Sequence, residues 1–167
     1  MTAEEVIQLL GLEPLPVEGG YFRRTYCSDE IVPQPSLPHR YVVDHPFSTA
    51  IYFLITKTEF SHFHSLLSDE TYHFYLGDPV ELVELLPDGE SRVTVLGQDI
   101  ANGQKLQHTV MRNNFQASYL RPGGEWALLG CTVAPGFDTN DFIAGNWEQL
   151  LRTHPKQHMI IMKLTKK

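Results

Sequence analysis

Two histidines two residues apart, with a glutamate six residues after the second, carry the most chemistry in this sequence: His62, His64 and Glu70. In an extended strand, side chains two residues apart share a face and rise together by about 6.5–7 Å, so both imidazoles can lean toward one point. A carboxylate on the next antiparallel strand would complete a cluster of two nitrogens and one oxygen, which divalent metals accept. The spacing therefore predicts a site across two neighbouring strands, with a divalent metal ion as a candidate cofactor.

The segments on either side of the histidine pair predict the strands that position it. Residues 49–55 and 71–76 are rich in β-branched and aromatic side chains, and residues 77–79, Gly-Asp-Pro, predict a turn. If Glu70 faces the interior, alternation along the strand sends Tyr72 inward and His73 to the opposite face. His73 is therefore not expected to serve as a further ligand.

The rest of the chain predicts one helix followed by many short strands. Thr2 and Glu5 form a capping box before apolar residues at helical spacing, and Gly11 ends the helix. Short strands at about ten-residue spacing are typical of an all-β sandwich or barrel of the jelly-roll kind. No linker divides the chain, so we expect residues 1–167 to form a single domain. Strands are expected at 80–86 and 91–96 as a hairpin, at 105–110, 115–120 and 126–133, with helical turns at 147–151 and a strand or helix at 159–164.

Composition excludes several classes of partner. The 167 residues carry a net charge of −7, and the 13 Lys and Arg are scattered apart from a few at the C-terminus, which argues against nucleic acid. The acidic start does not resemble a signal peptide, and the longest apolar run, residues 50–55, is far shorter than the ~20 residues of a membrane helix. We therefore expect a soluble, cytoplasmic protein whose Cys27 and Cys131 are reduced.

The histidine pair, Glu70 and the later Gly77 together resemble the first cupin motif, and residues 122–124, Pro-Gly-Gly, resemble the turn of the second. Four blocks are similar to those of a cupin subfamily known as DUF985: PVEGGYFRRTY at 16–26, STAIYFL at 48–54, SDETYHFY at 68–75 and VAPGFD at 133–138. The resemblance covers nearly the whole chain. It implies a double-stranded β-helix with a short N-terminal helix and a minor C-terminal one, frequent homodimers, and structural kinship with sugar-nucleotide epimerases. It implies no reaction, because fold does not fix function.

Two departures from the cupin motifs leave the metal question open. Five residues separate His64 from Glu70, one or two more than the common motif has, which lengthens the loop between them. Ala127 stands where metal-binding cupins carry a third histidine, and a methyl group cannot bind a metal. At most His62, His64 and Glu70 remain as ligands, and a metal-free pocket with the same residues is the alternative.

Further candidate site residues carry both a functional and a structural interpretation. Trp126 can stack on a sugar or base face, although a large aromatic in a jelly roll is as often core. Of the adjacent Arg23 and Arg24, one is expected to point into the barrel and the other outward, and either can bind a phosphate. We take Arg23 as the candidate substrate-binding residue. Residues 18–20, Glu-Gly-Gly, are more readily explained as a structural element, because the two glycines permit a bend with positive φ. A homodimer through residues 18–26 would cover the sheet edge there.

Three functional hypotheses follow. The first is a metal-free isomerase or epimerase acting on a sugar or sugar nucleotide, with His64 as base and Tyr72 as acid, and with His62, Glu70, Trp126 and Arg23 binding the substrate. The second is a metal-dependent oxygenase or isomerase in which His62, His64 and Glu70 hold the metal. The third is a module that binds a small polar metabolite without turning it over. The partner expected in each case is a small polar, sugar-like or nucleotide-like molecule.

Overall fold

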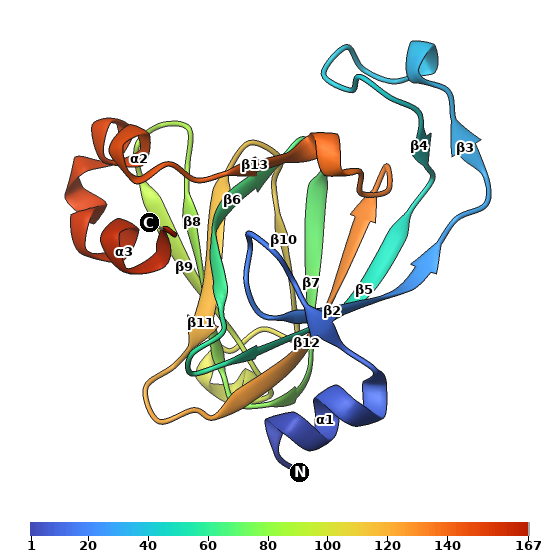
Figure 1. Cartoon of the computed structure of the whole chain (residues 1–167). Helices are drawn as coiled ribbons and strands as arrows, with labels where there is room; N and C mark the ends of the chain where they lie inside the picture. Colours follow the sequence, from blue (N-terminus) through green and yellow to red (C-terminus); the bar gives the residue numbers. More distant parts are fainter. Residues whose placement is uncertain (167) are drawn as a thin grey trace.

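The computed structural model describes residues 1–166 and contains two antiparallel β-sheets that face one another (Figure 1). The first sheet has the order β1 (Glu13–Pro14), β2 (Tyr21–Cys27), β5 (Thr49–Thr56), β12 (Trp126–Ala134), β7 (Asp69–Gly77) and β10 (Gln107–Val110). The second has the order β13 (Phe142–Ala144), β6 (Ser61–Leu66), β11 (Phe115–Leu120), β8 (Val80–Leu85) and β9 (Ser91–Leu96). Strands distant in sequence are neighbours in both sheets, so the all-β jelly-roll prediction is confirmed.

The core lies between the two sheets and is built by alternation along their strands. In β7, Tyr72 and Phe74 are buried and face inward, whereas His73 and Tyr75 lie on the outer face with stacked rings. This is the alternation that the sequence predicted, and it leaves His73 outside the barrel. The buried inner residues are Phe53, Ile55, Tyr72, Phe74, Val80, Leu82, Leu96, Val110, Leu120, Ala127, Leu129 and Cys131.

Helices cover the outer face of each sheet. Helix α1 (Ala3–Leu10) begins with the predicted capping box, ends at Gly11 in the left-handed conformation, and packs through Val6 on the outside of the first sheet. Helices α2 (Trp147–Thr153) and α3 (His158–Leu164) cover the second sheet near the C-terminus (Figure 1). Residues 159–164 therefore form a helix rather than a strand, because Ile161 and Leu164, three residues apart, bury one helical face. No helix within residues 1–166 is long and apolar enough to cross a membrane.

Short elements that the sequence did not predict complete the structure. Strands β3 (Ile31–Val32) and β4 (His45–Pro46) pair in an arm that projects from the sheets at the upper right of Figure 1, with 3-10 turn η1 (Gln34–Ser36) between them. The arm is anchored to the body because the buried Tyr41 shares a hydrogen bond with Ser68, 2.8 Å between the oxygens. The remaining 3-10 turns are η2 (Ile100–Asn102), η3 (Thr139–Asp141) and η4 (Pro155–Gln157).

Candidate functional site

A cavity of about 430 Å³ opens between the two sheets at the end where β13 and η3 lie. Its position at the mouth of a β-barrel and its volume, within the roughly 300–1,000 Å³ usual for ligand pockets, are typical of a small-molecule site. Apolar side chains form most of the wall: Leu15, Pro16, Val17, Phe22, Ile51, Leu66, Val133, Phe137 and Phe142. The polar lining is Glu18, Arg24, Thr49, His64, Glu70, Cys131 and Thr139.

His64 presents one ring nitrogen to this cavity in a defined protonation state. Its strand β6 pairs with β11, and its ring stacks on Phe142 with centroids 5.1 Å apart. Nδ1 lies 2.9 Å from the His62 carbonyl oxygen, which can only accept, so Nδ1 carries the proton in the neutral ring. The unprotonated Nε2 therefore faces Glu18, whose Oε2 is 3.9 Å away.

Glu18 reaches the site from the loop between β1 and β2. Gly19 has φ +100°, and a Cβ there would stand 2.3 Å from the Phe60 carbonyl oxygen, so only glycine lets the loop approach β6 this closely. The Glu18 carbonyl oxygen accepts hydrogen bonds from the His62 N–H at 2.9 Å and from His62 Nδ1 at 2.7 Å. Ser61 Oγ donates to Glu18 Oε1 at 2.9 Å, which fixes the carboxyl group. These contacts hold Glu18 beside His64.

Glu70 provides the second carboxyl group, from β7. Its side chain is buried, and Gln116 Nε2 donates to Glu70 Oε2 at 2.6 Å. Gln116 Oε1 is buried without a partner among the described residues. The cavity therefore places one imidazole and two carboxyl groups in surroundings that are otherwise mostly apolar.

Burial shifts the pKa of all three groups away from their usual values. Burial raises the pKa of Glu18 to about 7, against the opposing hydrogen bond from Ser61. Burial and then the charge of Glu18 raise the pKa of Glu70 to about 7. Burial lowers the pKa of His64, although the charge of Glu70 partly offsets this. Near neutral pH the imidazole is thus a neutral proton acceptor, and both carboxyl groups are close to the midpoint of their titration, where each can donate a proton.

The structure brings only part of the predicted site together. His64 and Glu70 line the cavity, whereas His62 lies under the Glu18 loop and outside the cavity wall. The pairing of β6 with β11 shifts register between Ser61 and His64, so simple alternation does not hold between the two histidines. Tyr72 points inward but is enclosed in the core beside the cavity and does not line it. Burial, followed by the charge of Glu70, raises the pKa of Tyr72 well above its usual value, which makes it a poor proton donor at neutral pH.

Two of the predicted substrate-binding residues lie outside the barrel. Ala127 faces the core opposite Ile55, so the preceding Trp126 faces outward, where it packs beside α1 and donates to the Met1 carbonyl oxygen at 3.2 Å. Arg23 also faces outward, with its guanidinium 5.7 Å from the centre of the Tyr52 ring. Neither candidate substrate-binding residue lines the cavity, because strand alternation sends the neighbouring residue inward in each case.

The cavity does not assemble the predicted metal ligands. His62 does not line the cavity with His64 and Glu70, and the inward position that carries a third histidine in metal-binding cupins is filled by the buried methyl group of Ala127. Within residues 1–166, no three side chains of His, Cys, Asp or Glu are grouped so that they could hold a metal ion. The residues present therefore do not fit a bound divalent ion of the facial-triad kind.

Two cavity residues were not selected from the sequence. Glu18 was interpreted as part of a structural bend, since nothing local shows that a loop 44 residues before His62 folds onto it. Arg24 lines the cavity with an exposed side chain and so lies at its rim, and alternation had left it equal to Arg23. The register in which β2 pairs with β5 decides which of the two arginines faces the cavity, and sequence alone does not supply that register.

Comparison with known proteins agrees with this architecture. Residues 4–144 match the family model described as Cupin superfamily (DUF985). The chain is 32% identical over 142 residues to the Saccharomyces cerevisiae protein named Uncharacterized protein YML079W, covering 78% of this chain and 70% of the yeast protein. A hypothetical protein from Leishmania major superposes with a TM-score of 0.89 at 31% identity, over 100% of both chains. Protein SO0799 from Shewanella oneidensis gives 0.87 at 33% identity, covering 99% of this chain and 98% of the other.

Proposed function

The chain belongs to the cupin superfamily, in the family described as DUF985, and we propose that its barrel binds a small molecule and moves a proton on it without a metal ion. The observation that carries this proposal is the unprotonated Nε2 of His64, which faces a carboxyl group inside a cavity with mostly apolar walls. A neutral imidazole that can accept a proton, beside carboxyl groups that titrate near pH 7, is the arrangement that general acid–base catalysis requires.

The cavity also argues for the kind of molecule bound. Burying two carboxyl groups and an imidazole costs free energy unless a ligand or ordered water satisfies them. A ligand that offers hydroxyl or carbonyl groups to Glu18, His64 and Glu70 would do so, while its carbon skeleton packs on walls such as Phe137 and Phe142. A compact sugar, or a hydroxy- or oxo-compound of similar size, has both features. If the molecule extends beyond the cavity, Arg24 at the rim is placed to bind an anionic group such as a phosphate.

Isomerisation or epimerisation next to a carbonyl group uses these residues in complementary ways. His64 Nε2 takes the proton from the carbon, and the electron pair moves to the carbonyl oxygen, which receives a proton from the carboxyl group of Glu18 or Glu70. If His64 then returns the proton to the neighbouring carbon while the carboxylate takes up the hydroxyl proton of the enediol, the product is the isomer. If instead the second carboxyl group protonates the original carbon on its opposite face, and the first carboxylate takes back the enol proton, the product is the epimer, and transfer of the proton from His64 to the second carboxylate restores the site. Neither route involves a net redox change. The acid is then a carboxyl group and not Tyr72.

The test combines ligand binding with hydrogen exchange. A thermal-shift screen of sugars, sugar nucleotides and oxo acids identifies binders, because a ligand at a hundred times its dissociation constant adds about 2.7 kcal/mol and raises the melting point by several degrees. Each binder is then incubated with the protein in D₂O with EDTA, and loss of its C–H signal is followed by proton NMR. We expect exchange with wild type, at least 100-fold slower exchange with His64→Gln, and unchanged exchange with the matched control His73→Gln, whose ring lies outside the barrel.

A binding module without turnover is the second candidate. The observation that favours it is the enclosure of Tyr72, which removes the expected phenolic acid from the cavity wall. A compound that raises the melting point in wild type but not in His64→Gln, with no deuterium incorporation, would support this candidate. Exchange that continues at the wild-type rate in His64→Gln, or that disappears with EDTA, would contradict the metal-free proton transfer.

A further inference from the structure

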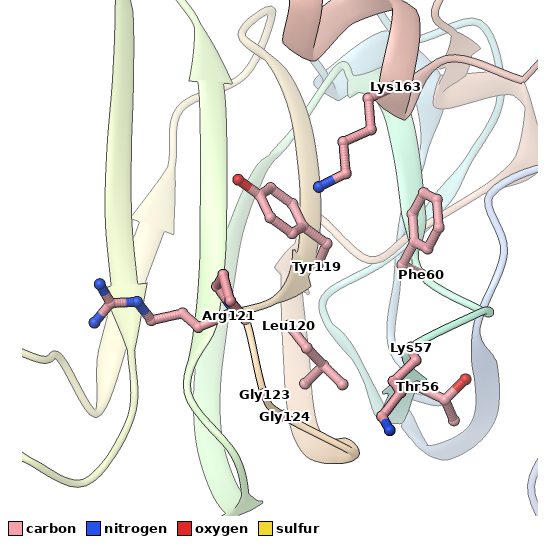
Figure 2. A pocket seen from close by; sticks show the side chains of 10 residues that line it. Thr56, Lys57, Phe60, Tyr119, Leu120, Arg121, Gly123, Gly124 and Lys163 are labelled. Carbon is pink, nitrogen blue, oxygen red and sulfur yellow. The ribbon is translucent and has the colours of Figure 1, made fainter.

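A second pocket, of about 380 Å³, lies where β5 and β11 end and shares no lining residue with the barrel cavity. It is formed where the loop after β5, the end of β11, the following turn and helix α3 meet (Figure 2). The rings of Phe60 and Tyr119 stand on two sides, with Leu120 between them at the base (Figure 2). Two aromatic walls and an aliphatic floor form an apolar slot that opens to solvent.

The charge in this pocket differs from that of the molecule as a whole. The protein has a net charge of −7, yet the three charged residues of the pocket are all cations: Lys57, Arg121 and Lys163. Lys57 pairs with the exposed Glu125, and the Arg121 guanidinium is directed away from the pocket, where it lies 3.4 Å from Glu81 (Figure 2). Lys163 differs from both, because no carboxylate of a described residue lies within 4 Å of its Nζ.

Lys163 is nevertheless held in place. Its Nζ stands 4.1 Å from the centre of the Tyr119 ring, and Figure 2 shows the ammonium above that ring at the edge of the pocket. A cation–π contact of this kind positions the ammonium without neutralising its charge. The Tyr119 ring is itself fixed, since its hydroxyl donates to Glu81. The pocket thus presents one oriented positive charge next to an apolar slot.

We propose that this pocket, the Lys163 pocket, binds a small aromatic anion. The flat ring of the ligand packs on Phe60, Tyr119 and Leu120, and its carboxylate, sulfonate or phosphate group contacts the Lys163 ammonium. An anion without a ring gains only one ionic contact with an exposed lysine, which is worth little in water, and a ring without charge gains no contact with the ammonium. Both halves of the ligand are needed, so the site selects for aromatic anions. Nothing in this proposal depends on proton transfer in the barrel.

The probe is anilinonaphthalene sulfonate, an aromatic anion whose fluorescence rises in apolar surroundings. We expect saturable binding to the wild-type protein at low ionic strength and a dissociation constant about three- to fivefold higher in Lys163→Gln. Phe60→Leu, which keeps apolar volume but removes one ring face, should also weaken binding. The matched control is Lys156→Gln, which removes the same charge from the neighbouring η4, where Lys156 lies 3.6 Å from Glu90 and outside the pocket. That control should change the dissociation constant less than twofold.

Two further measurements locate the probe. Raising the salt concentration from 20 to 300 mM should weaken binding to wild type and have little effect in Lys163→Gln, because screening acts on the ionic contact. Inorganic phosphate at the same concentration as the probe should not displace it. Absence of saturable fluorescence would overturn the proposal. Equal affinity in wild type, Lys163→Gln and Phe60→Leu would also overturn it, because the probe would then bind elsewhere, for example in the barrel. Melting curves confirm that each variant is folded, and Lys163→Gln alters an exposed side chain.

Discussion

Replacing Glu70 with glutamine tests the electrostatics of the barrel site in isolation from any ligand. The substitution keeps the shape of the side chain and an oxygen that can accept the hydrogen bond from Gln116, but it removes the ability to ionise. Burial and the charge of Glu18 raise the pKa of Glu70 from 4.5 to about 7. Because the folded protein holds this proton more tightly than the unfolded chain, the associated stability is fully present below about pH 4.5 and is lost as the pH rises through 7.

The magnitude follows from the size of that shift. A difference of about 2.5 pKa units at about 1.36 kcal/mol each makes wild type about 3 kcal/mol less stable at pH 8 than at pH 4 through this group. Glu70→Gln removes the loss, so the variant should match wild type at pH 4.5 and exceed it by up to about 3 kcal/mol at pH 8.

Urea unfolding at pH 4.5, 6, 7 and 8 measures the effect, with Glu125→Gln as a matched control because that side chain is 66% exposed. The difference between wild type and the control should be nearly independent of pH. The reasoning is refuted if the difference between Glu70→Gln and wild type is the same at every pH, or if the variant is the less stable protein at pH 8.

Three further predictions concern the scaffold. Burial would raise the pKa of Glu84, but hydrogen bonds from His108, Arg92 and Asn114 lower it to about 2. Glu84→Gln should therefore reduce the free energy of unfolding in urea by about 3 kcal/mol at pH 7, and by progressively less as the pH falls from 4.5 toward 2. Gly19→Ala should lower the melting point and abolish ligand-induced shifts, since its Cβ would stand 2.3 Å from a carbonyl oxygen and displace the Glu18 loop. We also expect light scattering to give twice the chain mass of 19.0 kDa, because Tyr26 near the end of β2 and Phe47 just after β4 expose about half of their apolar side chains, which a partner subunit would cover. A mass of 19.0 kDa at micromolar concentration would contradict the homodimer.

The strongly patterned elements could be predicted from the sequence. Strands β5, β9 and β11 each alternate or carry continuous β-branched and aromatic residues, and their bounds agree with expectation to within one residue. The shared face expected for His62 and His64 rested on regular alternation, whereas β6 shifts its register against β11 between Ser61 and His64, and only His64 lines the cavity. By contrast, β3, β4 and β13 have only two or three residues, which is too few to show a period, and they form because distant segments supply their partners.

The composition of the site depended on contacts that are not local. Glu18 enters the cavity because two hydrogen bonds from His62 hold its carbonyl, and no sequence pattern couples these residues. The same contact draws His62 away from the cavity. Trp126 and Arg23 were placed on the wall because their type suits ligand binding, yet which of two adjacent residues faces inward depends on the register with β5. Residue type and spacing therefore pointed to His64 and Glu70, which line the cavity, but not to the carboxyl group of Glu18 beside them.

The central claim is that His64 stands in the barrel as a neutral base with Nε2 free. Long-range proton–nitrogen NMR on ¹⁵N-labelled protein, recorded from pH 5 to 9, reports the charge and tautomer of each imidazole directly. Our account predicts that His64 is neutral at pH 7, with the proton on Nδ1 where it binds the His62 carbonyl, and that burial keeps its pKa below the usual 6.5. A His64 ring that is doubly protonated at pH 7, or that carries its proton on Nε2, would contradict the account.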